Sequence, residues 1–321
     1  MLPTLSDIEQ AAAIVYSAMP ATPQYCWPLL CERLGTEVWV KHENHTPIGA
    51  FKVRGGLVYF DALVKDRTHP KGVISATRGN HGQSVGLAAR RHGIPATIVV
   101  PHGNSVEKNA AMRALGVELI EHGDDFQASM DYAQRLAREQ SLHMVPSYHR
   151  LLVAGVATYW VELLRAVPDL QTVYVPIGLG SGISAMLAAR AALGTTTEVV
   201  GVVSAHARAY LESFTQGKAI DCPVTTRIAD GMACRSPNAE ALEVILHGVD
   251  RIVEVTDAEV AHAMRTLFEC THNVSEGAGA APLAAALQEK HRNRGRKIAV
   301  TVSGGNIDTE LFASVLTGSF P

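Results

Sequence analysis

The sequence predicts an α/β protein built round a largely parallel sheet that is covered by helices on both faces. Short runs of β-branched and apolar residues alternate along the chain with segments of helical periodicity. These runs are apolar throughout, which indicates strands that are buried on both faces. Glycine-rich segments follow several of the runs, at the carboxyl ends where such sheets bind their ligands.

Each expected element has a local signal of its own. The helix over 105–116 stops at a glycine, and the helix over 124–140 carries acidic residues in its first turn, where they favour the helix dipole. The other expected helices are 82–93, 155–167 and 182–193, and a small-residue helix opens within 275–285. The expected strands are 36–41, 72–76, 96–101, 117–123, 172–178, 198–204, 251–256 and 297–305.

Composition excludes several classes of protein. The 321 residues carry a formal charge of −3, whereas nucleic-acid-binding domains usually show a basic surplus. No apolar run reaches the roughly 18 residues of a membrane span, and the N-terminus lacks the basic start of a signal peptide. The five cysteines form no CxxC pair, which indicates reduced thiols. We therefore expect a cytoplasmic protein without nucleic-acid or membrane partners.

Common catalytic patterns are missing from the sequence. There is no HExxH, no GxSxG elbow and no HxE…PCxxC, which argues against a zinc protease, a triad hydrolase and a zinc deaminase. His42 and His45 have a spacing that suits a metal pair, but no third ligand is evident. We read them as surface or capping histidines and expect no metal site.

Two glycine-bearing loops could bind anions. Gly178, Gly180 and Gly182 lie between a strand and a helix, where backbone N–H groups and the helix N-terminus favour negative charge. The spacing is neither a P-loop nor GxGxxG, so the segment is either a phosphate cradle or a tight turn. The loop over 75–84 gathers many polar side chains, and it suits either a carboxylate site or a solvated cap.

Lys52 lies in the stretch GAFKVRGG (49–56), with an apolar residue on each side and glycines at both ends. Lysine is rarely buried unless a partner pairs with it. Lys52 is therefore either an ordinary surface lysine on a short loop or a reactive amine held in a pocket.

Four segments together resemble one enzyme family. KHENHTPIGAFKVRGG (41–56) resembles the lysine segment of the fold-type II pyridoxal-phosphate enzymes, which reads roughly K-x-E-N-x-x-P-x-G-S-F-K-x-R-G. GNHGQ (79–83), GLGSGI (178–183) and SGGN (303–306) follow in the family's order. The resemblance covers the chain from about residue 20 to residue 308. GNHGQ is similar to the serine/threonine dehydratase and serine racemase branch, whereas cysteine synthases carry Thr-Gly after the Asn.

The resemblance implies a fold of the tryptophan synthase β type, with two three-layer α/β lobes and pyridoxal 5′-phosphate in the cleft between them. We expect residues 1–63 and 150–321 to form the large cofactor-binding domain and residues 64–149 the small domain. The family usually forms dimers or tetramers, so we expect a homodimer or homotetramer.

The resemblance also assigns roles to residues. Lys52 would be the catalytic residue, forming a Schiff base with the cofactor, which requires a lowered pKa. Phe51 would pack near the ring, Asn80 would contact the ring hydroxyl, Glu276 would lie near the ring and Ser303 would face the pyridine nitrogen. The phosphate would be held by Gly178, Leu179, Gly180, Ser181 and Gly182. The substrate would be bound by Thr77, Arg78, Gly79, Asn80 and His81.

The implied reaction is the dehydration of a β-hydroxy-α-amino acid to a 2-oxo acid and ammonia. A serine opposite the pyridine nitrogen suits such an elimination, because the carbanion need not persist. The alternatives are β-replacement of the cysteine synthase kind, racemisation, and a non-enzymatic binder on the same fold. Oxo-acid formation without an added thiol would exclude β-replacement, and product accumulation would exclude a binder.

Two residues depart from the family pattern near the site. Ala50 replaces the usual Ser, for which we expect only a small packing change. Arg78 replaces a Ser or Ala that in serine racemase-like enzymes serves as the acid or base on the second face, and a guanidinium is a poor proton shuttle. Arg78 could pair with the carboxylate of a 3-hydroxyaspartate, lie over the ring of a 3-phenylserine, or point away from the substrate.

The sequence also predicts which ions the protein can bind. In serine racemase-like relatives, acidic residues follow the strand that corresponds to 198–204, and the positions that align with them here are Ser204 and Tyr210. Neither is a carboxylate, so we expect no tight divalent site. Binding of a monovalent cation by backbone carbonyls stays open as an alternative.

Overall fold

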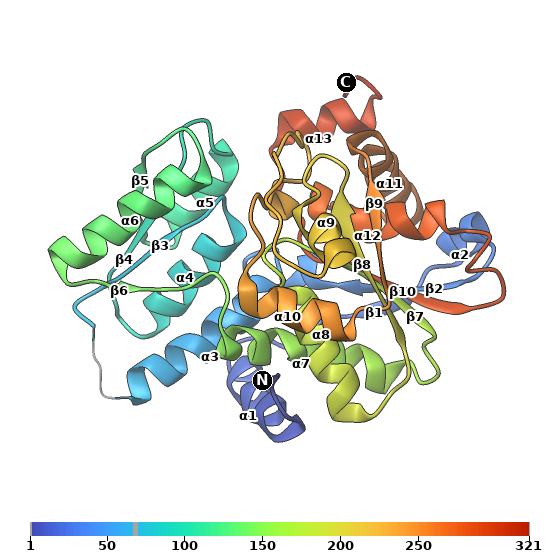
Figure 1. The fold of residues 1–321 in the computed structure, drawn as a ribbon, viewed down its shortest axis with the longest axis horizontal. Coiled ribbons are helices and arrows are strands. Elements are labelled where there is room, and N and C mark those ends of the chain that lie inside the picture. The colour runs from blue at the N-terminus through green and yellow to red at the C-terminus, as the bar shows by residue number, and fades with distance from the viewer. Residues whose placement is uncertain (1, 67–69, 321) are drawn as a thin grey trace.

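The computed structural model describes residues 2–66 and 70–320, which form two α/β lobes side by side (Figure 1). The larger sheet has six strands in the order β1-β2-β10-β7-β8-β9, and only β1 runs antiparallel to its neighbour. Its strands are β1 (Gln24–Cys26), β2 (Glu37–His42), β7 (Thr172–Pro176), β8 (Glu198–Ser204), β9 (Arg251–Val255) and β10 (Lys297–Val302).

The smaller sheet has four parallel strands in the order β5-β4-β3-β6. They are β3 (Val73–Ala76), β4 (Ala96–Val100), β5 (Glu118–Glu121) and β6 (His143–Met144). All four fall inside residues 64–149, the range expected for the small domain, and the domain boundaries themselves stay a prediction.

Thirteen α-helices and two 3₁₀ turns complete the regular structure of the described chain. The first helices are α1 (Leu5–Tyr16), α2 (Pro28–Leu34), α3 (Lys52–Lys65), α4 (Asn80–Arg91), α5 (Val106–Ala114) and α6 (Phe126–Gln140). The later ones are α7 (Arg150–Ala166), α8 (Ser181–Leu193), α9 (Ala209–Gln216), α10 (Ala239–Gly248), α11 (Asp257–Thr271), α12 (Gly277–Gln288) and α13 (Thr309–Leu316). The turns are η1 (Glu43–His45) and η2 (Asp230–Met232).

Each sheet is the middle of three layers. Successive side chains of a strand point to opposite faces, and in β7 Val173 joins the core under α7 and α8 while Tyr174 joins the core under α11 and α12. In β3, Val73 packs with residues of α4 and Ile74 packs with residues of α6. The expected α/β class with two three-layer lobes is confirmed.

The chain departs from the expected elements at several points. Lys52 is the first residue of α3 rather than part of a short loop, and α7 begins at Arg150 rather than near Gly155. Strands β1 and β6 are only three and two residues long, which is too short for a period to show in the sequence. Across residues 2–66 and 70–320, no helix combines the length and the apolar character that crossing a membrane requires.

Candidate active site

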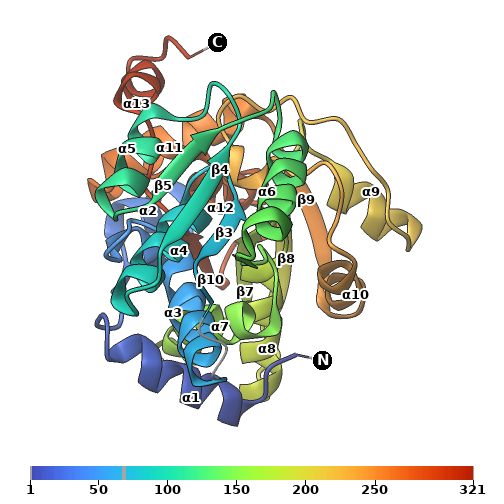
Figure 2. The same cartoon turned by 90° about the vertical axis from the view of Figure 1, so that its left-hand side faces the viewer.

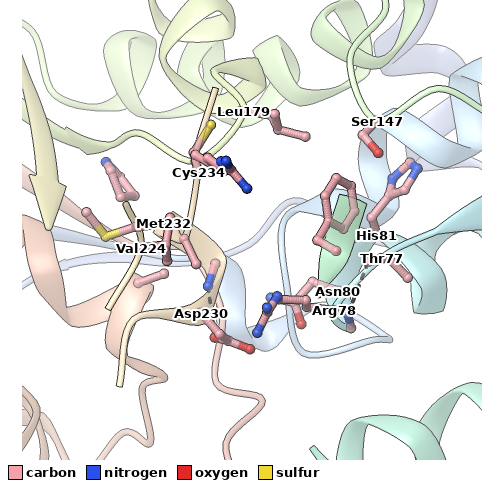
Figure 3. A pocket seen from close by; sticks show the side chains of 18 of the residues that line it. Thr77, Arg78, Asn80, His81, Ser147, Leu179, Val224, Asp230, Met232 and Cys234 are labelled. Atoms are coloured by element: carbon pink, nitrogen blue, oxygen red, sulfur yellow. Dashed lines mark hydrogen bonds between the residues drawn. The ribbon is translucent and has the colours of Figure 1, made fainter. Parts of the chain in front are cut away.

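A cavity of about 720 Å³ lies between the two lobes, at the carboxyl ends of strands from both sheets. Its volume is in the upper part of the range of about 300–1,000 Å³ that is usual for ligand pockets. All fourteen residues assigned to the site from the sequence line this cavity. In Figure 3, Thr77, Arg78, Asn80 and His81 lie on one side of it, facing Asp230, Val224, Met232 and Cys234.

Lys52 reaches the cavity from the first turn of α3. Its Nζ donates a hydrogen bond to Ser181 Oγ at 3.0 Å and lies 4.9 Å from the centre of the Phe51 ring. Burial lowers the pKa of Lys52 to about 8, against the opposing charge of Glu276. A neutral amine is therefore accessible near physiological pH, which is what a nucleophilic or basic lysine needs.

Buried ion pairs hold the start of α3. Arg54 lies two residues after Lys52 and has no exposed surface. It donates to Glu43 Oε2 at 2.8 Å and to Glu162 Oε1 at 2.6 Å, and Lys41 also pairs with Glu162 at 2.6 Å. Burial alone would lower the pKa of Arg54, but Glu43 and Glu162 outweigh it and raise that pKa. This network orients the turn that carries Lys52.

The loop between β7 and α8 has the shape of an anion cradle. Gly180 has φ +97°, and a Cβ there would lie 2.6 Å from Ala241 Cβ. A Cβ on Gly178 would lie 2.3 Å from the carbonyl oxygen of Gly231. Only glycine fits these two positions, and α8 begins directly afterwards at Ser181 with unpaired backbone N–H groups. The hydroxyl of Tyr210 donates to the Leu179 carbonyl at 3.1 Å and fixes the loop from behind.

The loop between β3 and α4 presents polar groups to the cavity. Gly79 N donates to Thr77 Oγ1 at 3.1 Å, and Gly79 has φ +154°, which favours glycine. His81 is buried, and burial lowers its pKa to about 3, so its imidazole is neutral. His81 Nε2 has no hydrogen-bond partner among the described residues. A substrate carboxylate or cofactor atom could supply that partner.

Asn80 and Glu276 connect the two lobes. Asn80 Nδ2 donates to Glu276 Oε1 at 2.7 Å, and Asn80 Oδ1 accepts from Asn306 Nδ2 at 2.9 Å. Ser303 is buried at the end of β10, and its carbonyl oxygen accepts from Phe51 N at 3.0 Å. The lysine segment, the Asn80 loop and the Ser303 loop thus meet around one volume.

The residues present fit pyridoxal 5′-phosphate. They supply an amine of lowered pKa, a glycine cradle ahead of a helix for the phosphate, and an aromatic ring, Phe51, near both. A Cβ on Gly182 would lie 3.7 Å from Phe51 Cζ, so the ring packs directly on the cradle. The contacts of each single residue with the cofactor or the substrate stay predictions.

Arg78 lines the cavity, and its Nε is buried without a hydrogen-bond partner in the part of the chain that the structure describes. The residues across the cavity from Arg78 include the apolar Leu179, Val224 and Met232 as well as the charged Asp230 (Figure 3).

Sequence reasoning did not find several residues of the cavity, above all Lys108 and Asp230. Lys108 is buried, and its Nζ lies 2.6 Å from Asp230 Oδ2. A partial signal exists, because Lys108 shares a helix face with Met112, four residues later, which is fully buried. Asp230 follows a long stretch without regular secondary structure, and no periodicity marks it.

Comparison with known proteins agrees with this geometry. The family model described as "Pyridoxal-phosphate dependent enzyme" matches residues 17–304. The L-threonine ammonia-lyase of Thermotoga maritima is 33% identical over 314 residues, which cover 98% of this chain and 78% of that protein. The catabolic L-threonine dehydratase TdcB of Staphylococcus aureus is 33% identical over 318 residues, covering 98% of this chain and 92% of that protein.

Solved structures are similar along almost the whole chain. The processed form of threonine deaminase isoform 2 from Solanum lycopersicum matches with a TM-score of 0.89 and 25% identity, covering 98% of this chain and 94% of that one. Maize serine racemase matches with a TM-score of 0.90 and 28% identity, covering 99% of this chain and 98% of that one. The chain belongs to the pyridoxal-phosphate-dependent enzymes of fold type II and is similar to their threonine dehydratases.

Proposed function

We propose that this protein is a dehydratase that converts a β-hydroxy-α-amino acid into a 2-oxo acid and ammonia. The observation that carries the proposal is Lys52, a half-buried amine whose pKa is lowered to about 8, beside a glycine cradle and a carboxylate loop. The similarity to threonine dehydratases and ammonia-lyases supports the reaction type. The replacement of the usual Ser or Ala by Arg78 argues against racemisation, because a guanidinium does not release its proton.

Different residues of the cavity have different roles in the proposed reaction. When bound, pyridoxal phosphate supplies the electron sink for the carbanion at the substrate Cα. Lys52 Nζ removes the proton from Cα, while Thr77, Gly79 and His81 hold the α-carboxylate. The β-hydroxyl takes up the proton that Lys52 Nζ removed from Cα and leaves as water. The released enamine then reacts with water to give the 2-oxo acid and ammonia. Ser303 would donate a hydrogen bond to the pyridine nitrogen.

The substrate side chain that we favour is aromatic, as in 3-phenylserine. The cavity is large, and Val224, Met232 and Leu179 offer apolar surface across from Arg78. A guanidinium can lie over the face of an aromatic ring. A methyl group, as in threonine, would leave much of this surface without contacts.

A second candidate substrate is 3-hydroxyaspartate, and one observation favours it. Arg78 Nε is buried without a partner among the described residues. A guanidinium pairs strongly with a carboxylate in two-pronged geometry.

A substrate panel with two arginine variants tests these assignments. 2-Oxo-acid formation from threonine, 3-hydroxyaspartate and 3-phenylserine is measured for wild type, Arg78→Ala and Arg78→Lys. For phenylserine, we expect kcat/KM to fall about 10-fold in Arg78→Ala, the equivalent of about 1.4 kcal/mol, with threonine changed much less.

Arg78→Lys separates the two side chains, because a lysine keeps the charge but loses the planar stacking surface. Loss of phenylserine activity in Arg78→Lys identifies stacking of the guanidinium on the aromatic ring, whereas hydroxyaspartate activity that Arg78→Lys keeps and Arg78→Ala loses identifies pairing with a carboxylate. An equal loss on all three substrates in both variants rejects any role of Arg78 in specificity.

A further inference from the structure

Helix α5 belongs to the small lobe, yet its first turn contacts the large lobe. Asp308 Oδ1, ahead of α13, accepts hydrogen bonds from Ser105 Oγ at 2.6 Å and from Glu107 N at 3.1 Å. In return, Glu107 Oε1 accepts from Thr309 N at 2.7 Å. Each of the two helix N-termini is thus capped by a carboxylate from the other lobe. In Figure 2, α13 lies directly above α5.

Lys108 makes a second connection one residue further, inside the cavity. The residue is 5% exposed, and its Nζ lies 2.6 Å from Asp230 Oδ2 and 3.3 Å from Glu276 Oε2. Both carboxylates belong to the large lobe. Burial alone would lower the pKa of Lys108, but Asp230 and Glu276 outweigh it and raise that pKa. A charged ammonium therefore bridges the cleft.

The carboxylate loop, residues 77–81, packs on the stem of Lys108. A Cβ on Gly79 would lie 2.5 Å from Lys108 Cδ and 3.2 Å from Lys108 Cγ. The backbone at Gly79 thus approaches the lysine as closely as a residue without a side chain permits. If the side chain of Lys108 moved, the loop would lose the surface on which it packs.

The carboxylate loop also contacts Glu276 directly, through Asn80. Asn80 Nδ2 donates to Glu276 Oε1, while Lys108 Nζ faces Glu276 Oε2. Glu276, Lys108, Gly79 and Asn80 thus form a closed ring of contacts that includes two residues of the carboxylate loop. Among the described residues, Lys108 is the cation that forms an ion pair with Glu276, while the neutral amide of Asn80 adds a hydrogen bond.

We propose that Lys108 is a positioning residue that holds the carboxylate loop in its binding geometry by pairing with Asp230 and Glu276 across the cleft. This inference deepens the proposed function and rests on it for the role of the loop. In this proposal, the contact between Lys108 and the large lobe determines how tightly the amino acid binds and has little effect on the rate of the chemical step.

Lys108→Met tests the assignment, because methionine keeps much of the stem and removes the charge. We expect KM for the amino acid to rise about 10- to 100-fold, as a misplacement of about 1 Å in a positioning group can cause. We expect kcat to change less than about 3-fold, because the contact acts equally on bound substrate and transition state. The amino-acid concentration that half-shifts the visible absorbance of the bound cofactor should rise by the same factor as KM.

Glu107→Gln is the matched control, because it weakens the contact between α5 and Thr309 N, which lies outside the cavity. It should lower the thermal unfolding midpoint while KM changes less than about 2-fold, because it leaves the Lys108 contacts in place. If Lys108→Met and Glu107→Gln change KM alike, Lys108 merely helps to hold the lobes together, and the proposal is overturned. An unchanged KM in a folded Lys108→Met variant overturns it as well.

Asp230→Asn provides a second route if Lys108→Met does not fold. Its side chain is 34% exposed, so the substitution disturbs packing less. It should also raise KM, and an unchanged KM in this variant would contradict the pairing. Wild type is assayed in parallel: if it yields no 2-oxo acid from any β-hydroxy amino acid, the proposed function fails, while the absorbance titration still decides the role of Lys108.

Discussion

At the scale of single residues, the half-buried Lys52 has a lowered pKa, and this has a measurable consequence for stability. In the protein without cofactor the pKa of Lys52 is about 8, whereas an unfolded lysine titrates near 10.4. Between these values the unfolded chain binds more protons than the folded one. The contribution of Lys52 to folding stability must therefore rise with pH across this window.

Lys52→Met should reveal this effect. At about pH 7 the cofactor-free variant should be more stable than the cofactor-free wild type by about 2–3 kcal/mol, since one pKa unit corresponds to about 1.4 kcal/mol. The advantage should shrink as the pH rises from about 8 to about 10.5. Urea unfolding of both proteins across this range measures the difference, and a difference independent of pH would show that the Lys52 pKa is not lowered.

The sequence is informative about residues to very different degrees. Lys52, Asn80 and Ser303 stand in short motifs, so a resemblance can place them in one cavity. Lys108 and Asp230 stand in no such motif, and apart from the helix face that Lys108 shares with Met112 they read in the sequence as ordinary surface residues. The distance of 2.6 Å between Lys108 Nζ and Asp230 Oδ2 is what marks them as a pair. Contacts between side chains far apart in the chain leave no local pattern.

At the scale of elements, the turn between β7 and α8 depends on one backbone conformation. Gly180 has φ +97°, and an added Cβ would lie 2.6 Å from Ala241 Cβ. Alanine at this position must therefore displace either the turn or α10. The backbone N–H groups at the start of α8 would then no longer converge on one anion.

Gly180→Ala should weaken cofactor binding by about 10-fold or more, because a left-handed alanine alone costs about 1–2 kcal/mol before the contact with Ala241 is counted. Gly194 offers a matched control at the other end of α8, with φ +63° and no atom within 4 Å of an added Cβ. Gly194→Ala should lower stability slightly and leave cofactor affinity unchanged. Equal affinities of the two variants for pyridoxal phosphate would rule out the cradle.

The elements also show which parts of the fold a sequence reveals. Eight of the strands and six of the helices (α4, α5, α6, α7, α8 and α12) are recognisable, because most of them are periodic or apolar runs of adequate length. Helix α3 is hidden by Gly55 and Gly56, which lower helical propensity. The structure explains both glycines: an added Cβ would lie 2.9 Å from Leu152 O at Gly55 and 2.2 Å from Ser84 Oγ at Gly56. Close packing against α7 and α4 outweighs local propensity here.

At the scale of the whole molecule, the two lobes meet at the cavity, and each lobe contributes residues to its lining. The large lobe supplies Lys52, the glycine cradle and Ser303, while the small lobe supplies the loop that contains Thr77 and His81. Ion pairs and reciprocal helix caps join the lobes at α5. The expected homodimer or homotetramer stays a prediction, and binding of a monovalent cation stays an open alternative.

The most direct test of the account is the stoichiometry of product formation by the purified enzyme loaded with pyridoxal phosphate. With a β-hydroxy-α-amino acid and no added thiol, we predict equal amounts of ammonia and the corresponding 2-oxo acid. Lys52→Ala should lose at least about 1,000-fold in rate, because the proposed mechanism gives this residue the roles of both nucleophile and base. Turnover at the wild-type rate by Lys52→Ala, or inversion of the substrate without ammonia, would contradict the assignment of this protein as a dehydratase.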